Sequence, residues 1–226
     1  MKKNLFIFVI AGIFSCTLIS LNAYSSTNGI QQQTNKETKE QLNAKATKAA
    51  RSEAKKLQKE GWTTTPGALP IDKQLDKSYL MQYEYDDNNL PKYIMGEAMS
   101  IGENYDAAKM QALELAKQNL AGQIQTEVTA LVENSVANKE LAADDAASIS
   151  SSVLASKNLI SQSLGRVLPI VEVYRTKDNK NKEVLVRVAY SYASAVDAAK
   201  KAIRADLEAK GNNMQDKLDK VLGSSK

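Results

Sequence analysis

Histidine is absent from the 226-residue chain, and cysteine occurs once, at position 16. Without imidazole, no histidine can ligate a metal, accept a proton near neutral pH, or complete a Ser/His or Cys/His relay. The single thiol also excludes an internal disulfide, so the fold rests on its apolar core. We therefore predict that the protein is not an enzyme, with no catalytic residue, no metal site and no cofactor.

The chain also has no large excess of charge of one sign. Lys and Arg number 30 against 26 Asp and Glu, a formal net charge of +4. Two of the lysines, Lys2 and Lys3, lie in the N-terminal segment, so the remainder is closer to neutral. Proteins that bind nucleic acid carry a concentrated basic face, and we expect no nucleic-acid partner.

A long apolar run occurs at the N-terminus and nowhere else. Lys2 and Lys3 precede a run from Leu5 to Leu21, and Leu21-Asn22-Ala23 follows as a cleavage site. This layout predicts a secretory signal peptide over residues 1–23. A spanning helix needs about 20 apolar residues, and several polar residues dilute this run. We expect an exported protein, in the periplasm or associated with the outer membrane or cell surface.

Cys16 leaves two interpretations open. Ile13-Phe14-Ser15 before it partly resembles a lipobox, which would make Cys16 a lipidation site and the protein membrane-bound. The bulky Phe14 fits that pattern poorly, and the apolar run continues past Cys16 to Leu21. We favour Cys16 as an ordinary residue of the signal peptide, so a membrane partner is expected only if lipidation occurs.

The next segments differ in composition. Residues 24–35, with Gln31-Gln32-Gln33, predict a disordered tether, and residues 36–91 predict a helical N-terminal extension. An Ala-rich helix over 36–60 ends at Gly61, with Trp62 folding back as a Schellman contact. Pro70 opens a second helix. The Ala-rich stripe of the first helix is weak, so we expect it to dock on the main domain, on an envelope protein or on a second copy.

Residues 92–210 predict an α+β domain. The pattern gives a strand over 93–101, a long helix from Tyr105, a further helix to Gly165, strands over 166–176 and 183–192, and a last helix opened by a capping box at Ser194. Residues 211–226 predict a tail helix. The order β-α-α-β-β-α, behind two N-terminal helices, predicts a three-stranded sheet packed on one face by long helices.

Part of this domain resembles a known family. The segment Tyr93-Ile94-Met95-Gly96-Glu97-Ala98, small residues on the following helix, and a valine-rich hairpin resemble the small LPP-type surface lipoproteins of Gram-negative envelopes; the small residues are Ala107, Ala108, Ala112, Ala116 and Ala121. A related domain occurs in flagellar-assembly lipoproteins. The resemblance covers about residues 92–208 and implies an envelope or surface accessory role, without catalytic residues. The poor lipobox at Cys16 departs from the family.

Some candidate chemical groups have ordinary structural explanations. Gly96 and Gly102 bracket the end of the first strand, but their spacing matches neither a dinucleotide fingerprint nor a phosphate loop. We interpret them as a structural strand-end turn. The pairs Asp86-Asp87 and Asp144-Asp145 suit turns and helix caps. The serine run 148–152 lacks a base partner and predicts the polar face of a helix.

Four residues remain as candidates for binding a ligand: Tyr79, Tyr83, Tyr93 and Glu97. Glu97 interrupts an apolar strand face, which favours an edge charge that discourages aggregation over a buried site residue. Aromatic rings can stack on sugars, although the helical spacing of Tyr79 and Tyr83 favours packing. The function predicted first is thus a non-catalytic envelope accessory protein acting through protein or envelope contacts. The alternatives are a module that binds glycan, peptidoglycan or a small amphiphile and, third, a carboxylate hydrolase.

Overall fold

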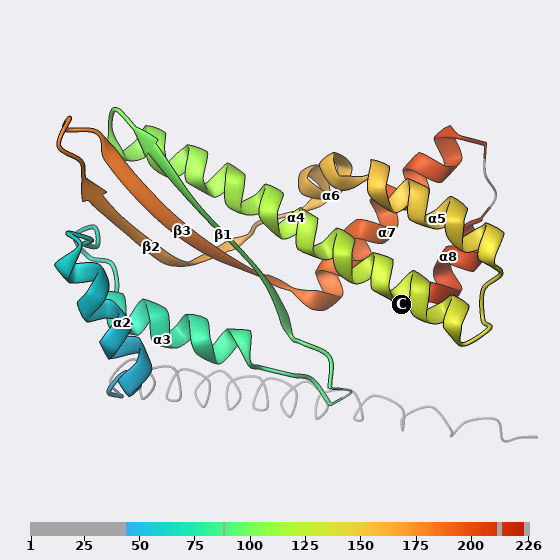
Figure 1. Ribbon diagram of the computed structural model, residues 1–226, viewed down its shortest axis with the longest axis horizontal. Coiled ribbons are helices and arrows are strands. Elements are labelled where there is room, and N and C mark those ends of the chain that lie inside the picture. Colours follow the sequence, from blue (N-terminus) through green and yellow to red (C-terminus); the bar gives the residue numbers. More distant parts are fainter. Residues whose placement is uncertain (1–43, 88, 212–213, 224–226) are drawn as a thin grey trace, which may run out of the picture. The chain divides into compact units, whose positions relative to one another are not determined.

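The computed structural model describes residues 44–87, 89–211 and 214–223 (Figure 1). The predicted signal peptide, Cys16 and the predicted tether lie outside the described residues. From Ala46 onward the chain forms one compact unit. In the described ranges, no helix combines the length and the apolar character needed to cross a membrane.

The centre of this unit is a three-stranded antiparallel sheet. Its strands are β1 (Tyr93–Gly102), β2 (Leu168–Thr176) and β3 (Lys182–Ser191), in the order β1-β3-β2. The predicted α+β class with a three-stranded sheet is confirmed. Pro169 lies on an edge strand next to a register shift between Pro169 and Val171, because proline cannot donate a ladder hydrogen bond.

The described helices agree with the predicted order, with three differences in their limits. They are α2 (Lys48–Lys59), α3 (Ile71–Gln82), α4 (Tyr105–Ala137), α5 (Ala143–Ala155), α6 (Lys157–Ser163), α7 (Tyr192–Ala209) and α8 (Gln215–Leu222). In the described residues, the helix predicted over 36–60 begins only at Lys48, because Thr47 caps it and residues 44–47 are not helical. The helix predicted to reach Gly165 is divided at Ser156, whose hydroxyl donates to Ser152 O at 2.6 Å and competes with the backbone pattern. The last long helix is capped by Ser191, whose Oγ accepts from Ser194 N, so the predicted cap at Ser194 was wrong by three residues.

One face of the sheet packs on α4 (Figure 1). Small buried residues lie between them. The buried stripe of α4 begins with Ala108, Ala112 and Ala116, while the larger Leu113 beside it is only half-buried. On β1 the face that meets α4 contains Gly96 and its alternate neighbours, so Met99 and Ile101 lie on the other face and are each 48% exposed. Small residues on both sides allow the helix backbone to lie close to the strand.

The opposite face of the sheet is covered by α2 and α3. Trp62, Leu75, Val171 and Val173 belong to one buried cluster there, with buried alanines of α2. The predicted Schellman contact is confirmed, because Trp62 N donates to Leu57 O at 3.0 Å behind Gly61, which has φ +87°. The Ala-rich stripe of the described part of α2 is therefore buried within the chain's own fold.

Candidate functional site

Glu97 is held in place as a structural ion pair. It lies opposite Arg187 in the β1–β3 ladder, and its Oε2 is 2.6 Å from Arg187 Nη2. Arg187 Nη1 also donates to Ser78 Oγ at 2.8 Å, which joins the pair to α3. β1 is an edge strand, as we predicted. The carboxylate accepts from the guanidinium, and this contact favours a role in joining β1, β3 and α3.

The four candidate residues do not form one cluster. Tyr79 packs against the cluster around Trp62, and its hydroxyl donates to Glu53 Oε2. Burial and that hydrogen bond raise the pKa of Tyr79 to about 12. Tyr83 follows the last residue of α3 and is 69% exposed. Tyr93 is half-buried at the start of β1. Of the two tyrosines at helical spacing, Tyr79 packs against the core and Tyr83 faces solvent.

A hairpin after Tyr83 brings other groups together. Its backbone is closed by Lys92 N donating to Glu84 O at 2.8 Å and by Asp86 N donating to Leu90 O at 2.8 Å. The carboxylate of Asp86 also accepts from Leu90 N at 2.9 Å. The Lys92 ammonium lies 2.8 Å from Glu84 Oε1, and this contact raises the pKa of Lys92. Asp86 thus stabilises the turn, which is the role predicted for the neighbouring residues Asp86 and Asp87.

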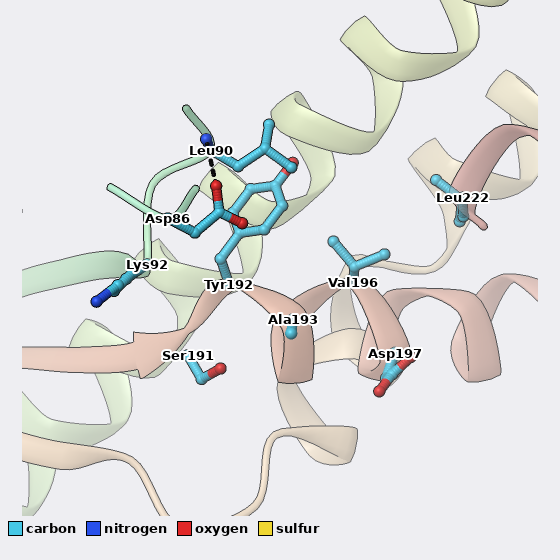
Figure 2. Close-up of a pocket in the computed structure, with 9 residues that line it drawn as sticks. All are labelled: Asp86, Leu90, Lys92, Ser191, Tyr192, Ala193, Val196, Asp197 and Leu222. Carbon is cyan, nitrogen blue, oxygen red and sulfur yellow. Dashed lines mark hydrogen bonds between the residues drawn. The ribbon is translucent and has the colours of Figure 1, made fainter. Parts of the chain in front are cut away.

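This hairpin, the start of α7 and Leu222 of α8 line an open pocket of about 400 Å³ (Figure 2). The hairpin is fixed to α7 because Tyr192 N donates to Lys92 O at 2.9 Å. Burial raises the pKa of Tyr192, and the charges of Glu127 and Asp86 raise it further. The residues that line the pocket are Asp86, Leu90, Lys92, Ser191, Tyr192, Ala193, Val196, Asp197 and Leu222.

The pocket mixes apolar and charged groups. Leu90, Val196 and Leu222 supply apolar surface, while Asp86 and Asp197 supply carboxylates. Such a lining suits a small ligand with hydroxyl groups and an apolar face. The Asp86-Asp87 pair predicted a turn here, but the sequence contained no signal that this turn meets Ser191–Asp197 and Leu222, since those segments are about a hundred residues or more away.

The serine run lies beside Lys210, which no pattern in the sequence singles out. Lys210 Nζ is 3.4 Å from Ser152 Oγ, but it is also 2.6 Å from Asp206. The hydrogen bond from Lys210 lowers the pKa of Asp206, and this ion pair engages the ammonium beside the buried Ser152. Asp145, in the first turn of α5, pairs with Lys217 at 2.6 Å.

Neither a metal-binding cluster in the described residues nor a relative assigns a function to the chain. Among the residues that the structure describes, no group of three or more His, Cys, Asp or Glu side chains could hold a metal ion. No family model, no curated protein and no solved structure matches the chain.

Proposed function

We propose that the protein is a non-catalytic, exported accessory protein of the cell envelope that acts through contacts with protein or envelope components. The observation that carries the proposal is the N-terminal sequence: Lys2 and Lys3, an apolar run to Leu21, and a small residue at Ala23. These are the three regions of a secretory signal peptide in their usual order.

The arrangement of charged groups supports the non-catalytic part of the proposal. Glu97 is engaged by Arg187, Asp145 by Lys217, and Asp219 by Lys200 at 2.9 Å. A general acid or base needs a pKa near the working pH and access to a substrate, and carboxylates in such pairs serve mainly to join elements. A Glu97→Gln variant that abolished a measured turnover would contradict this role and favour the hydrolase.

Mass spectrometry of the mature N-terminus tests export. Cleavage by signal peptidase gives a chain that begins at Tyr24, whereas a diacylated or triacylated Cys16 identifies the lipoprotein that the LPP-type resemblance implies. A Val9→Arg variant places a charge in the apolar run and should block processing, while Gln32→Arg, beyond the cut, should not. A cytosolic protein that retains Met1 would contradict the proposal.

A second function, binding of glycan or a small amphiphile, is favoured by one observation. Tyr83 and Tyr85 are 69% and 53% exposed, and Leu90 is 42% exposed, on or beside the hairpin that lines the pocket. Exposed aromatic rings with a polar tip suit stacking on sugars. The exposed Tyr83, rather than the packed Tyr79, is the better candidate for such a contact.

Saturable binding to isolated cell wall tests this alternative. Tyr83→Ala should weaken binding at least about tenfold if the ring contributes about 1.4 kcal/mol. Leu80→Ala, at another exposed position of α3 (60% exposed), is the matched control. Binding that is absent in the wild type, or equal in both variants, would reject a tyrosine-based site.

A further inference from the structure

The outer side of α2 carries a stripe of lysines. Lys48, Lys55 and Lys59 lie seven and four residues apart, a spacing that places them on one side of a helix, and Lys56 lies beside them. All four side chains are exposed. The two alanines that α2 buries lie on the opposite side of the helix, against the core shared with α3 and the sheet. The lysine stripe, as we call these four residues, therefore points away from the protein.

The charge of the lysine stripe is not neutralised by nearby carboxylates. Glu53 of α2 accepts from the hydroxyl of Tyr79 on the inner side, and Glu60, after the last residue of α2, lies 3.8 Å from Arg175. Among the residues that the structure describes, no carboxylate lies within ion-pair distance of the four lysines. In contrast, α3 and α8 each contain as many aspartates as lysines. The outer side of α2 thus concentrates positive charge that the balanced composition of the whole chain conceals.

The stability of the helix does not account for the whole stripe. Lys56 and Lys59 lie in the last turn of α2, where a cation interacts favourably with the helix dipole. Lys48, however, is the first residue of the helix, and the first turn contains no acidic residue. The N-terminal end of a helix favours carboxylates over cations, and the like charges of Lys55 and Lys59, four residues apart, repel each other. An anionic partner explains all four positions.

We propose that the lysine stripe binds the anionic phospholipid headgroups of a membrane surface. The twelve residues of α2 extend over about 18 Å, so the stripe can contact several headgroups at once. Lysine carries a compact charge on a flexible stem, which suits a diffuse layer of phosphates better than one shaped ligand. Four or more basic residues on an amphipathic helix are typical of binding to anionic lipids. Because α2 exposes no large apolar side chain, the contact is electrostatic and involves no insertion.

The sequence before α2 favours a lipid surface over other anionic partners. The apolar run that ends at Leu21 precedes α2 in the chain, and a signal peptide delivers its protein at a membrane. The contact needs no lipid anchor, unlike the membrane partner expected only if Cys16 is lipidated. The proposal names one envelope component and rests on the proposed function for its setting. Binding of the purified chain to lipid does not require export, so either proposal can fail without the other.

Cosedimentation with lipid vesicles tests the binding. The chain from Tyr24 lacks the apolar run and contains the whole compact unit from Ala46, so the apolar run cannot cause the binding. This chain should bind vesicles of phosphatidylcholine and phosphatidylglycerol in equal parts, but not vesicles of phosphatidylcholine alone. At about 1 M salt the Debye length falls to about 3 Å, and the binding should be lost.

Removing charge from the lysine stripe tests its role. Lys48→Gln, Lys55→Gln and Lys59→Gln together should weaken binding to the anionic vesicles about a hundredfold, because each lysine near such a surface strengthens binding about fivefold. The circular dichroism spectrum should not change, since the three side chains are exposed and glutamine is a good helix former.

The matched control removes the same charge from other elements. Lys157→Gln, Lys180→Gln and Lys201→Gln, all at exposed positions, should leave the binding within about twofold of the wild type, because charges beyond the Debye length are screened. Equal weakening in both triple variants would overturn the proposal, because net charge alone would then cause the binding. Equal binding to anionic and neutral vesicles would also overturn it. So would tighter binding to isolated cell wall or duplex DNA, which would assign the stripe to another polymer.

A fluorescent label at position 52 tests which surface meets the membrane. Ser52 is exposed on the same side of α2 as Lys48 and Lys55, and the chain from Tyr24 contains no cysteine. On anionic vesicles, a label on Ser52→Cys should become less accessible to the neutral quencher acrylamide. A label on Ser151→Cys, at an exposed position of α5, should remain accessible. A bound chain whose Ser52→Cys label stays accessible would show that another surface makes the contact.

Discussion

Gly96 determines how closely β1 can approach α4. A Cβ atom at this position would lie 2.3 Å from the backbone oxygen of Ala116 and 2.9 Å from Leu120 Cβ. The first of these neighbours is helix backbone and cannot rotate away. The glycine therefore has a packing role, in the middle of the strand rather than at its end. Gly102, whose Cβ would lie 2.7 Å from Ala108 N, has the comparable role at the strand end.

We expect Gly96→Ala to destabilise the fold by about 1–3 kcal/mol or more, because the added methyl group overpacks the interface with α4. Urea unfolding followed by circular dichroism measures the change. Gly122→Ala is the matched control: its Cβ would meet only the flexible end of Lys157 at 3.5 Å. Alanine stabilises a helix interior by about 1 kcal/mol relative to glycine, so the two substitutions should have opposite signs. Equal effects would contradict the role of Gly96.

Tyr79 makes the free energy of unfolding depend on pH in the alkaline range. Its pKa rises from 10.0 to about 12, first because of burial and second because its hydroxyl donates to Glu53. The folded state therefore favours the neutral phenol more than the unfolded state does. The contribution of this pKa shift to the free energy of unfolding is fully present below pH 10. It is lost as the pH rises from 10 toward 12.

We expect Tyr79→Phe to reduce the loss of stability between pH 10 and 12 relative to the wild type. The free energy of unfolding, measured by urea titration at several pH values, gives this slope. Tyr83→Phe, at the 69% exposed ring, should leave the slope unchanged. A Tyr79→Phe variant with the wild-type slope would show that another group causes the alkaline loss.

At the scale of elements, α8 is attached by apolar packing of Leu218, Val221 and Leu222 on the core and by polar contacts beside it. Leu218 is fully buried. Lys200 on α7 is 3% exposed, and its ammonium donates to Gly223 O at 2.5 Å and lies 2.9 Å from Asp219. The hydrogen bond from Lys200 is the main cause that lowers the pKa of Asp219. A cation near the C-terminal end of α8 also interacts favourably with the helix dipole.

We expect Lys200→Met to detach α8 locally and to leave the sheet intact. Losing a charge-assisted hydrogen bond costs about 1.5–3 kcal/mol, which corresponds to at least about tenfold faster amide exchange in α8. Hydrogen–deuterium exchange reports α8 and the strands separately. Lys201→Met, at the exposed neighbouring position, is the control. Uniformly faster exchange in all elements would instead indicate global destabilisation.

At the scale of the whole molecule, the sheet is covered on both faces. The α4 side buries Val184, Val186 and Val188, and the side of α2 and α3 buries Val171 and Val173. The N-terminal extension predicted over residues 36–91 thus includes two helices that complete a core. The compact unit begins at Ala46, whereas the sequence placed the start of the main domain near Lys92.

We expect a fragment that begins at Lys92 to be much less stable than one that begins at Ala46. The shorter fragment exposes Val171, Val173 and Leu185 to water, and each large apolar side chain that loses its burial costs about 1.5–3 kcal/mol. Thermal melts and binding of a hydrophobic dye compare the two fragments. Equal melting temperatures would show that residues 92–226 form an independent domain.

Local sequence patterns predicted the helices and strands well. They predicted poorly which elements and side chains contact one another in the fold. Gly61 and Trp62 predicted a Schellman motif because that motif depends on adjacent residues only. The alternation of Val184, Val186 and Val188 predicted a strand for the same reason. The partner of Glu97 could not be predicted, because Arg187 is ninety residues away and is placed by register. The pocket beside Tyr192 was missed because its lining comes from three distant segments.

The sequence alone therefore determined the class of the fold, the order of its elements and the expectation of export. Hydrophobic period, caps and glycines act over a few residues and can be found without coordinates. The tertiary structure decided which face of β1 meets α4, how Glu97 is neutralised, and which strand lies at the centre of the sheet. These depend on the relative position of surfaces far apart in the chain, and the packing of whole helices and strands fixes that position.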